Sequence, residues 1–341
     1  MLPILVVGQE KKNYRVRTIA FYNVENLFDI KDDTLTFDDD RTPEGKYRWT
    51  KKRYHRKIGN IAKVISEIGS NISGTSPDII GLCEVENLQV LQDLTAHQNL
   101  ASKDYGIIHF DSPDERGIDV ALLYKKAVFV PTSSDSRRLL LFDTEGDRDY
   151  TRDQLVVGGL LDTEQLYFII NHWPSRSGGE TRSRPGRIAA AKLNKRIMDS
   201  LVRHNPEAKI ISMGDLNDDP RDESLKKVLK TMGRRQVSDS TKVEVQLFNP
   251  MEKLSRKGIG SLAYRDKWNL FDQIFFTTNL LNKEKGVFQF WKAGVFDAAY
   301  LKTKRGPYKG YPLRTYAGGS YTDGYSDHFP VYVYLIKETE N

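Results

Sequence analysis

The feature that most constrains the fold is a series of short apolar segments, rich in β-branched residues and of strand length. They occupy residues 16–22, 79–83, 120–124, 155–161, 167–170, 210–213, 273–276 and 331–336. Apolar residues recur with helical spacing at 54–68 and at 187–203. Because several strand segments adjoin and can pair as hairpins, the series predicts an α/β (α+β) chain whose sheets are mixed rather than all parallel.

The length of 341 residues suits about two domains or one large one. No internal repeat and no linker rich in Pro, Gly or Ser divides the chain, so we expect one domain over 14–338, with irregular insertions at 29–49 and 299–322. Residues 1–13 form an N-terminal segment, interpreted as a truncated signal-peptide remnant or as an ordinary frayed end. The first interpretation predicts a secreted or periplasmic protein, and the second a cytoplasmic one.

Composition excludes several classes of protein. Hydrophobic residues at 39%, charged residues at 29% and aromatic residues at 11% exclude disorder for the bulk of the chain. A single cysteine, Cys83, excludes an intrachain disulfide and a cysteine-based zinc site. No apolar stretch approaches the roughly 18 residues of a membrane-spanning helix. The net charge of +6 suits an anionic substrate, and nothing indicates an obligate protein partner.

Polar side chains able to do chemistry stand at the ends of many of the apolar segments. Strand ends are where short loops bring catalytic groups together in layered α/β folds. The carboxylates and carboxamides are hard oxygen ligands for Mg²⁺, and the imidazoles can transfer protons. No Ser or Cys stands next to a base in these segments, so the sequence shows no obvious covalent nucleophile. The candidates are Asn23, Glu25, Glu84, His172, Asp215, Asn217, Asp272, Asp327 and His328.

Six segments resemble, in order, the motifs of the endonuclease/exonuclease/phosphatase superfamily, the deoxyribonuclease I-like group. They are FYNVEN at 21–26, DIIGLCE at 78–84, NHWP at 171–174, GDLND at 214–218, FDQI at 271–274 and SDHFP at 326–330. Each motif alone is weak, but six in the right order span about residues 18–336. The resemblance implies a four-layer sandwich, in which two mixed β-sheets pack face to face and helices lie outside.

The resemblance also implies a divalent metal, Mg²⁺ with Mn²⁺ and Ca²⁺ as alternatives. By its position in the motif, Glu84 is similar to the family's main carboxylate ligand of the metal. Asn23 lies beside it, and Asp327 is similar to a further ligand. Glu25 is an additional candidate, because it stands where several nucleases have Asp and its longer side chain either reaches the metal or bonds nearby.

The remaining motif residues match catalytic positions of the family. Asp215 is similar to the carboxylate that orients or deprotonates water, and Asn217 to a donor that holds a phosphate oxygen or Asp215. His328 is similar to the terminal histidine, with Asp272 as the carboxylate that fixes its tautomer. His172 matches a second histidine, for which we take Asp119 as the partner, although Asp119 could equally be a turn residue.

These residues predict a metal-dependent phosphoric ester hydrolase, in which water attacks phosphorus in line. We favour a nuclease-type phosphodiesterase, because basic and aromatic residues alternate at 46–57 and 302–314. A lipid or small-molecule phosphate is the alternative substrate, and a noncatalytic binding module on the same fold is the more distant one. Candidate substrate-binding residues are Arg176, Arg182, Lys304, Arg305 and Tyr308.

Overall fold

The structure is a computed structural model that describes residues 13–235 and 245–339. The N-terminal segment therefore lies outside the described residues, apart from Asn13. Two six-stranded sheets form the centre of the molecule. None of the helices in the described ranges combines the length and the apolar character that crossing a membrane requires.

The first sheet has the strand order β15-β18-β1-β2-β4-β3. Within it β1 and β2 are parallel, and every other neighbouring pair is antiparallel. The strands are β1 (Asn13–Leu27), β2 (Ile79–Val85), β3 (Tyr105–His109), β4 (Asp119–Lys125), β15 (Gln289–Val295) and β18 (Val331–Thr339). The sheet is thus mixed, as the sequence predicts.

The second sheet has the order β11-β14-β10-β9-β8-β5 and contains one parallel pair, β9 with β10. Its strands are β5 (Phe129–Arg137), β8 (Gln154–Leu161), β9 (Glu164–His172), β10 (Lys209–Asp215), β11 (Leu247–Phe248) and β14 (Asp272–Thr277). Three two-stranded ribbons complete the strands: β6 (Leu141–Phe142) with β7 (Arg148–Asp149), β12 (Leu262–Tyr264) with β13 (Lys267–Asn269), and β16 (Tyr316–Ala317) with β17 (Ser320–Tyr321).

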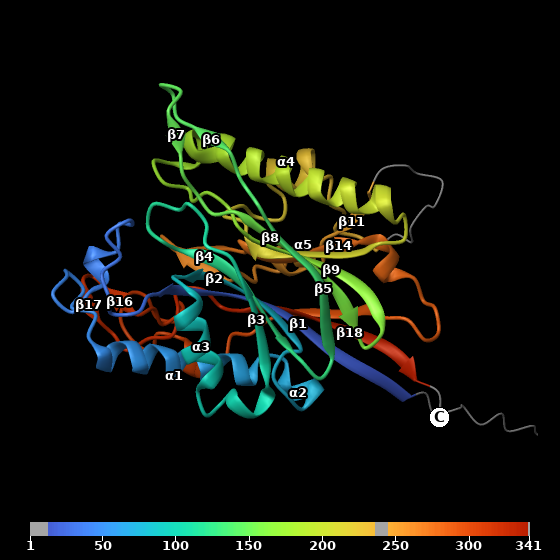
Figure 1. Ribbon diagram of the computed structural model, residues 1–341, viewed down its shortest axis with the longest axis horizontal. Coiled ribbons are helices and arrows are strands. Elements are labelled where there is room, and N and C mark those ends of the chain that lie inside the picture. The colour runs from blue at the N-terminus through green and yellow to red at the C-terminus, as the bar shows by residue number, and fades with distance from the viewer. Residues whose placement is uncertain (1–12, 236–244, 340–341) are drawn as a thin grey trace, which may run out of the picture.

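Helices cover the outer faces of the two sheets (Figure 1). In the view of Figure 1, α1 (Lys51–Glu67), α2 (Ser70–Ser73) and α3 (Leu88–Ala96) lie below the first sheet, and α4 (Glu180–His204) lies above the second. The short α5 (Met251–Ser255) contacts β14 and β15 at one edge of the sandwich. The predicted four-layer architecture is confirmed.

Strand alternation explains this layering. In β1, Ile19 and Phe21 pack into the core between the sheets. Ala20 and Tyr22 face the other way, into the apolar cluster between the first sheet and α1. In β10, Ile211 packs into the core between the sheets, and Ile210 packs in the cluster that includes residues of α4. Each sheet buries apolar side chains on both of its faces, which is why its strands read as nearly continuous apolar runs.

Each predicted strand and helix is present, with boundaries that differ in places. The second helix begins at Glu180 rather than near residue 187, since its first turns have no buried residue and lack apolar periodicity. The insertion at 29–49 is irregular apart from a short 3-10 turn. The insertion at 299–322 contains the β16–β17 ribbon, which is too short to read from sequence.

Candidate active site

The predicted catalytic residues converge where the ends of strands from both sheets meet. In the second sheet, Asp215 lies opposite His172 of β9 and opposite Asp272 of β14. In the first sheet, Asn23 of β1 lies opposite Cys83, immediately before Glu84 of β2. Because the two sheets pack face to face, these strand ends form one nearly buried polar centre.

The backbone is bent at these strand ends. Glu25, Asn26, Glu84 and Asn217 have φ values of 52°, 54°, 61° and 49°, in the left-handed region that non-glycine residues rarely adopt. Such conformations cost on the order of 1–3 kcal/mol each and persist where surrounding contacts enforce them. Here the backbone N–H of Asn26 donates to Glu84 Oε2 at 2.9 Å, and that of Asn217 donates to Asp215 Oδ1 at 3.0 Å.

Asn23 links the carboxylates of the two sheets. Its Nδ2 donates to Glu84 Oε1 and to Asp215 Oδ2, both at 3.1 Å. Its Oδ1 accepts the backbone N–H of Glu25 at 2.9 Å. In this arrangement Asn23 orients the two carboxylates by donating to both of them, while its oxygen binds the Glu25 backbone.

Asp215 is 2% exposed and lies among other ionisable groups. Burial is the largest effect on its carboxyl, and although the nearby charge of His328 opposes it, the pKa of Asp215 rises from 3.8 to about 6. A carboxylate with a pKa near neutrality is suited to accepting a proton. Asp215 Oδ2 also lies 3.8 Å from His328 Nε2.

Asp272 and His328 form a buried pair. Asp272 Oδ2 lies 2.6 Å from His328 Nδ1, which leaves Nε2 of the ring facing Asp215. Burial lowers the pKa of His328, but the charges of Asp272 and Asp215 outweigh burial and hold it well above its usual 6.5. Asp215, Asp272 and His328 lie close enough together to hold a metal ion, and a protonated His328 would instead place a positive charge there.

His172 is placed differently from His328. Its Nε2 lies 3.9 Å from Glu84 Oε1 and 3.9 Å from Asp215 Oδ2. Burial, together with the positive charges of Arg152, Arg116 and His328, holds the pKa of His172 well below 6.5, so the ring is neutral. Its Nδ1 is buried and has no hydrogen-bond partner among the described residues.

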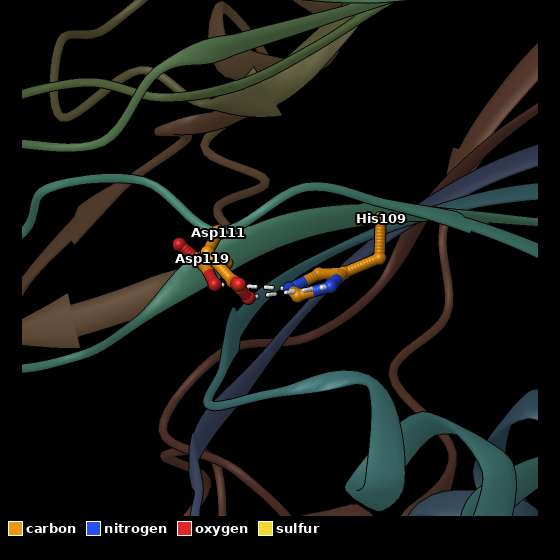
Figure 2. Close-up of side chains that lie close together, drawn as sticks. All are labelled: His109, Asp111 and Asp119. Carbon is orange, nitrogen blue, oxygen red and sulfur yellow. Dashed lines mark hydrogen bonds and ion pairs between the residues drawn. The ribbon is translucent and has the colours of Figure 1, made fainter. Parts of the chain in front are cut away.

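The prediction that Asp119 pairs with His172 is wrong. Asp119 Oδ2 lies 2.9 Å from His109 Nε2, and Asp119 Oδ1 accepts from the backbone N–H and the hydroxyl of Ser112. Figure 2 shows the carboxylates of Asp111 and Asp119 beside the His109 ring. The first-sheet strands β3 and β4 bring His109 and Asp119 together, and the sequence carries no motif that marks this pairing.

Glu25 follows the second of its two predicted alternatives, because its carboxylate bonds to groups beside the centre. Its Oε2 accepts the backbone N–H of Thr315 at 2.6 Å and lies 3.8 Å from Lys57 Nζ, and its Oε1 lies 3.4 Å from Arg314 Nε. Burial, the largest effect, raises the pKa of Glu25, and the two cations oppose that rise. The Glu25 carboxylate therefore belongs to a buried network of charged groups with Lys57 and Arg314.

Asp327, the remaining ligand candidate, sits at the rim. Its Oδ2 accepts from Arg314 Nη2 at 2.9 Å, and its Oδ1 lies 3.9 Å from His328 Nε2. The insertion at 299–322 supplies Arg314, which thus reaches the centre. The sequence interpretation placed Arg314 and Lys57 in its two basic and aromatic stretches but gave neither a partner at the centre. Lys57 follows Tyr54 by one helical turn and so lies on the apolar face.

Several predicted substrate-binding residues have structural partners or lie on the surface. Arg176 binds Asp218, Asp222 and the carbonyl of Asn217, so it braces the loop after β10. The side chain of Asn217 donates to the carbonyl of Trp173 at 3.0 Å, and only its backbone N–H contacts Asp215. The exposed candidates are Arg182, Lys304, Arg305 and Tyr308.

The donor set fits a divalent cation at one part of the centre. Glu84 Oε1 and Asp215 Oδ2 share one amide donor, Asn23, and lie near the neutral His172 ring. Oxygen ligands of this kind suit Mg²⁺ and similar ions, and carboxylates gathered with few cations favour a positive charge between them. Glu84 Oε1 and Asp215 Oδ2 are the two carboxylate oxygens that the structure brings together here.

The fold and the site together define the class: a two-sheet α/β sandwich with a carboxylate and imidazole centre for phosphate ester chemistry. The model of the Endonuclease/Exonuclease/phosphatase family matches residues 18–337, and the chain belongs to that family. Members of this family are phosphoester hydrolases that use divalent metals. The comparison with curated protein sequences finds no match.

Solved structures share this fold at low sequence identity. D. rerio TDP2, humanized by 14 mutations, is 16% identical with a TM-score of 0.53, and the match covers 94% of this chain and 98% of that one. A family protein of Bacteroides thetaiotaomicron is 18% identical with a TM-score of 0.54, covering 97% and 98%. A Bacteroides thetaiotaomicron mannosyl-6-phosphatase is 20% identical with a TM-score of 0.53, covering 94% and 99%. These likenesses establish the fold.

Proposed function

We propose that this protein is a nuclease-type phosphodiesterase that cleaves P–O bonds of nucleic acid by in-line attack of water. The observation that carries the proposal is the meeting of Glu84 and Asp215 with the charged Asp272–His328 pair at the joined ends of the two sheets. This arrangement combines a proton acceptor, a proton donor and oxygen ligands in one buried centre.

Each residue has a role that follows from its charge. Asp215, held by Asn23 and by the Asn217 backbone, accepts the proton of the attacking water. His328, kept protonated by Asp272, stabilises the phosphoryl oxygens or protonates the leaving oxygen. His172 is neutral and offers a hydrogen bond from one ring nitrogen.

Glu84, with Asp327 as a further ligand, would hold the divalent ion, and Asp215 stays free to accept the proton. When bound, the ion supplies positive charge to the phosphate and lowers the pKa of water. Asn23 holds the carboxylates of Glu84 and Asp215 side by side by donating to both of them. Arg314 neutralises Asp327 at the rim, and its guanidinium is half-exposed toward approaching phosphate.

The surface beside the centre supports nucleic acid as the substrate. The segment 299–322 carries Arg314, which contacts the site, and the exposed Lys304, Arg305 and Lys309. Tyr308, 59% exposed, lies among them and can stack on a base. Cations with an exposed aromatic ring beside the centre suit a strand that passes over it.

The experiment is a substrate panel with purified protein and Mg²⁺ or Mn²⁺. We expect cleavage of plasmid DNA, oligonucleotides or RNA, and little release of phosphate from mannose 6-phosphate or of phosphocholine from sphingomyelin. Hydrolysis of the monoester or the lipid without nucleic-acid cleavage would overturn the nuclease proposal. No hydrolysis of any substrate with either metal would favour a noncatalytic module.

A matched variant tests the strand-binding surface. Replacing Lys304, Arg305 and Lys309 by Gln should weaken nucleic-acid binding and flatten its salt dependence by about three units of slope at most, leaving a small chromogenic diester almost unaffected. Lys302 is left intact because it pairs with Asp297 at 2.5 Å. Equal losses on both substrates would instead indicate damage to the catalytic centre.

A further inference from the structure

One arginine reaches the catalytic centre from outside the two large sheets. Arg314 belongs to the insertion at 299–322, close to the β16–β17 ribbon that lies beside the start of α1 in Figure 1. Its Nη2 donates to Asp327 Oδ2 at 2.9 Å, and its Nε lies 3.4 Å from Glu25 Oε1. Because the side chain is 52% exposed, the guanidinium connects the buried centre with solvent.

The Asp327 carboxylate stands between two cations. Its Oδ2 accepts from Arg314, and its Oδ1 lies 3.9 Å from His328 Nε2. The two oxygens of one carboxylate therefore face two different cations. The guanidinium fork matches the spacing of the oxygens in a phosphate as well as in a carboxylate. One phosphate group beside Asp327 is thus able to contact the guanidinium and the imidazole at the same time.

Arg314 has donors left for such a phosphate. A guanidinium carries five N–H groups, and the hydrogen bonds to Asp327 and Glu25 use one N–H each. In the parts of the chain that the structure describes, Arg314 Nη1 makes no hydrogen bond. Burial would lower the pKa of this guanidinium, but the charges of Asp327, Glu25 and Glu84 outweigh burial and raise it. The guanidinium is therefore charged and lies near the carboxylates of the centre.

The backbone of Arg314 is held in a tight hairpin that extends the β16–β17 ribbon. The Leu313 carbonyl accepts the Tyr325 N–H at 2.7 Å. Gly324 lies against this backbone, since a Cβ atom there would stand 2.0 Å from the Arg314 carbonyl oxygen. Any other residue at position 324 would push the two chains apart, so Gly324 determines where Arg314 is placed.

Buried contacts with α1 and β1 fix the next residue, Thr315. Lys57 Nζ donates to Thr315 Oγ1 at 2.7 Å, and the Thr315 N–H donates to Glu25 Oε2 at 2.6 Å. All three residues are nearly buried. Arg314 is thus presented from a rigid support, and a binding group held in this way loses little conformational freedom when a ligand binds.

We propose that Arg314 binds a non-bridging oxygen of the phosphate under attack, and that Gly324 is the positioning residue for it. The phosphate lies beside Asp327, where Arg314 and His328 converge, and both cations face the charge of the phosphoryl oxygens in the transition state. The proposal rests on the phosphoester hydrolysis that the family shares, and it holds whichever ester is the substrate.

This role differs from that of the exposed Lys304, Arg305 and Lys309. Those three cations would contact a strand beyond the phosphate under attack, so their loss affects a polymer and spares a small ester. Arg314 would contact the reacting phosphate itself. Its loss should therefore affect a small ester and a polymer alike.

The test compares Arg314→Gln with Arg256→Gln. Arg256 is a matched control, because its side chain is 61% exposed and its Nη2 pairs with one carboxylate, that of Glu252, at 2.6 Å. It follows α5 at the edge of the sandwich. The first measurement is kcat/KM with Mg²⁺ on bis(p-nitrophenyl) phosphate, p-nitrophenyl phosphate and an oligodeoxynucleotide. The second is the binding of inorganic phosphate in the presence of Mg²⁺, followed by calorimetry.

We expect Arg314→Gln to lower kcat/KM by about 10² on every ester that the unchanged protein hydrolyses, since one donor to a developing oxyanion is worth on the order of 10² to 10³. Phosphate binding should weaken about tenfold or more. Arg314→Lys keeps the charge without the fork and should recover only part of both losses. Arg256→Gln should behave like the unchanged protein.

Gly324→Ala tests the positioning role. It should weaken phosphate binding as Arg314→Gln does, keep the affinity for Mg²⁺, and add little to the loss in the double variant with Arg314→Gln. A merely structural role would not separate phosphate affinity from Mg²⁺ affinity. Because the Arg314 side chain is half-exposed, Arg314→Gln decides the proposal even where Gly324→Ala lowers Tm.

Unchanged phosphate binding in Arg314→Gln would overturn the proposal. A loss of activity confined to the oligonucleotide would also overturn it, because Arg314 would then bind a neighbouring phosphate. Weaker Mg²⁺ binding with phosphate binding intact would make Arg314 a support for Asp327 instead. Hydrolysis of a small ester without nucleic-acid cleavage would contradict the nuclease proposal alone, whereas nucleic-acid cleavage that Arg314→Gln leaves unchanged would contradict this one alone.

Discussion

The carboxylate of Asp272 and the imidazole of His328 lie 2.6 Å apart although 56 positions separate them in the chain. The strand β14 supplies Asp272, and the turn before β18 supplies His328. The turn is held in place because the Ser326 hydroxyl donates to the Asn23 carbonyl and accepts from the His328 N–H. The pair is thus positioned by strands of both sheets.

We predict that Asp272 and His328 act as one unit. Removal of a positioned acid or base typically costs on the order of 10² to 10⁴ in rate, so His328→Ala should lose at least that much. Because Asp272 acts through His328, the double variant Asp272→Asn with His328→Ala should be little slower than His328→Ala alone. The measurement is kcat/KM on a diester. Losses that multiply would refute the pairing and leave Asp272 a structural role.

Activity should depend on pH in two limbs that can be assigned. Asp215 must be deprotonated to accept a proton, so kcat/KM should fall as pH drops through about 6. His328 must be protonated, so activity should fall again only well above pH 6.5. Because Asp215 and His328 interact, the apparent pKa of each limb reflects both groups together. Asp272→Asn removes a charge that favours the imidazolium and should move the alkaline limb to lower pH, and an unmoved limb would contradict this assignment.

Metal binding should depend on Glu84. Gln at this position keeps an oxygen for the Asn26 N–H but loses the negative charge, so Glu84→Gln should lose activity by about two orders of magnitude or more. It should also lose the rise in Tm that Mg²⁺ or Mn²⁺ gives the unchanged protein. Thermal unfolding with and without metal measures this.

Glu86→Gln is the matched control for Glu84. Burial, the largest effect, raises the pKa of Glu86 to about 8, so its carboxyl is protonated at pH 7 and Gln resembles it. We therefore expect Glu86→Gln to keep both activity and the metal-dependent Tm. An unchanged metal response in Glu84→Gln would contradict the ligand assignment.

The Lys57–Glu25 pair should contribute to stability through burial. Lys57 is 1% exposed, and burial lowers its pKa to about 8, while its Nζ donates to Thr315 Oγ1 and to the Tyr325 carbonyl. Breaking a buried ion pair costs about 3–5 kcal/mol, so Lys57→Met should lower the free energy of unfolding by roughly that amount. Adding Glu25→Gln should recover part of it. Urea denaturation provides the values, with the exposed Lys51→Met as control, and strictly additive losses would show that the two charges do not interact.

Much of the fold and part of the site could be predicted because they depend on local patterns. Apolar runs of strand length require burial on both faces, and this alone implies stacked layers. Asp215 was predicted because it follows such a run, and His328 because it precedes one, each within a motif that resembles the family. Glu84 was predicted in the same way, and the structure gathers all three at one place.

The sequence by itself determined which residues form strands and which polar groups stand at their ends, since both depend on neighbours within a few positions. Only the tertiary structure decided the partners of each charge. Asp119 binds His109 because β3 and β4 pair, and Glu25 turns to Lys57 because α1 packs under the first sheet. Side-chain direction and electrostatic partnership act through space, and the order of residues along the chain does not specify them.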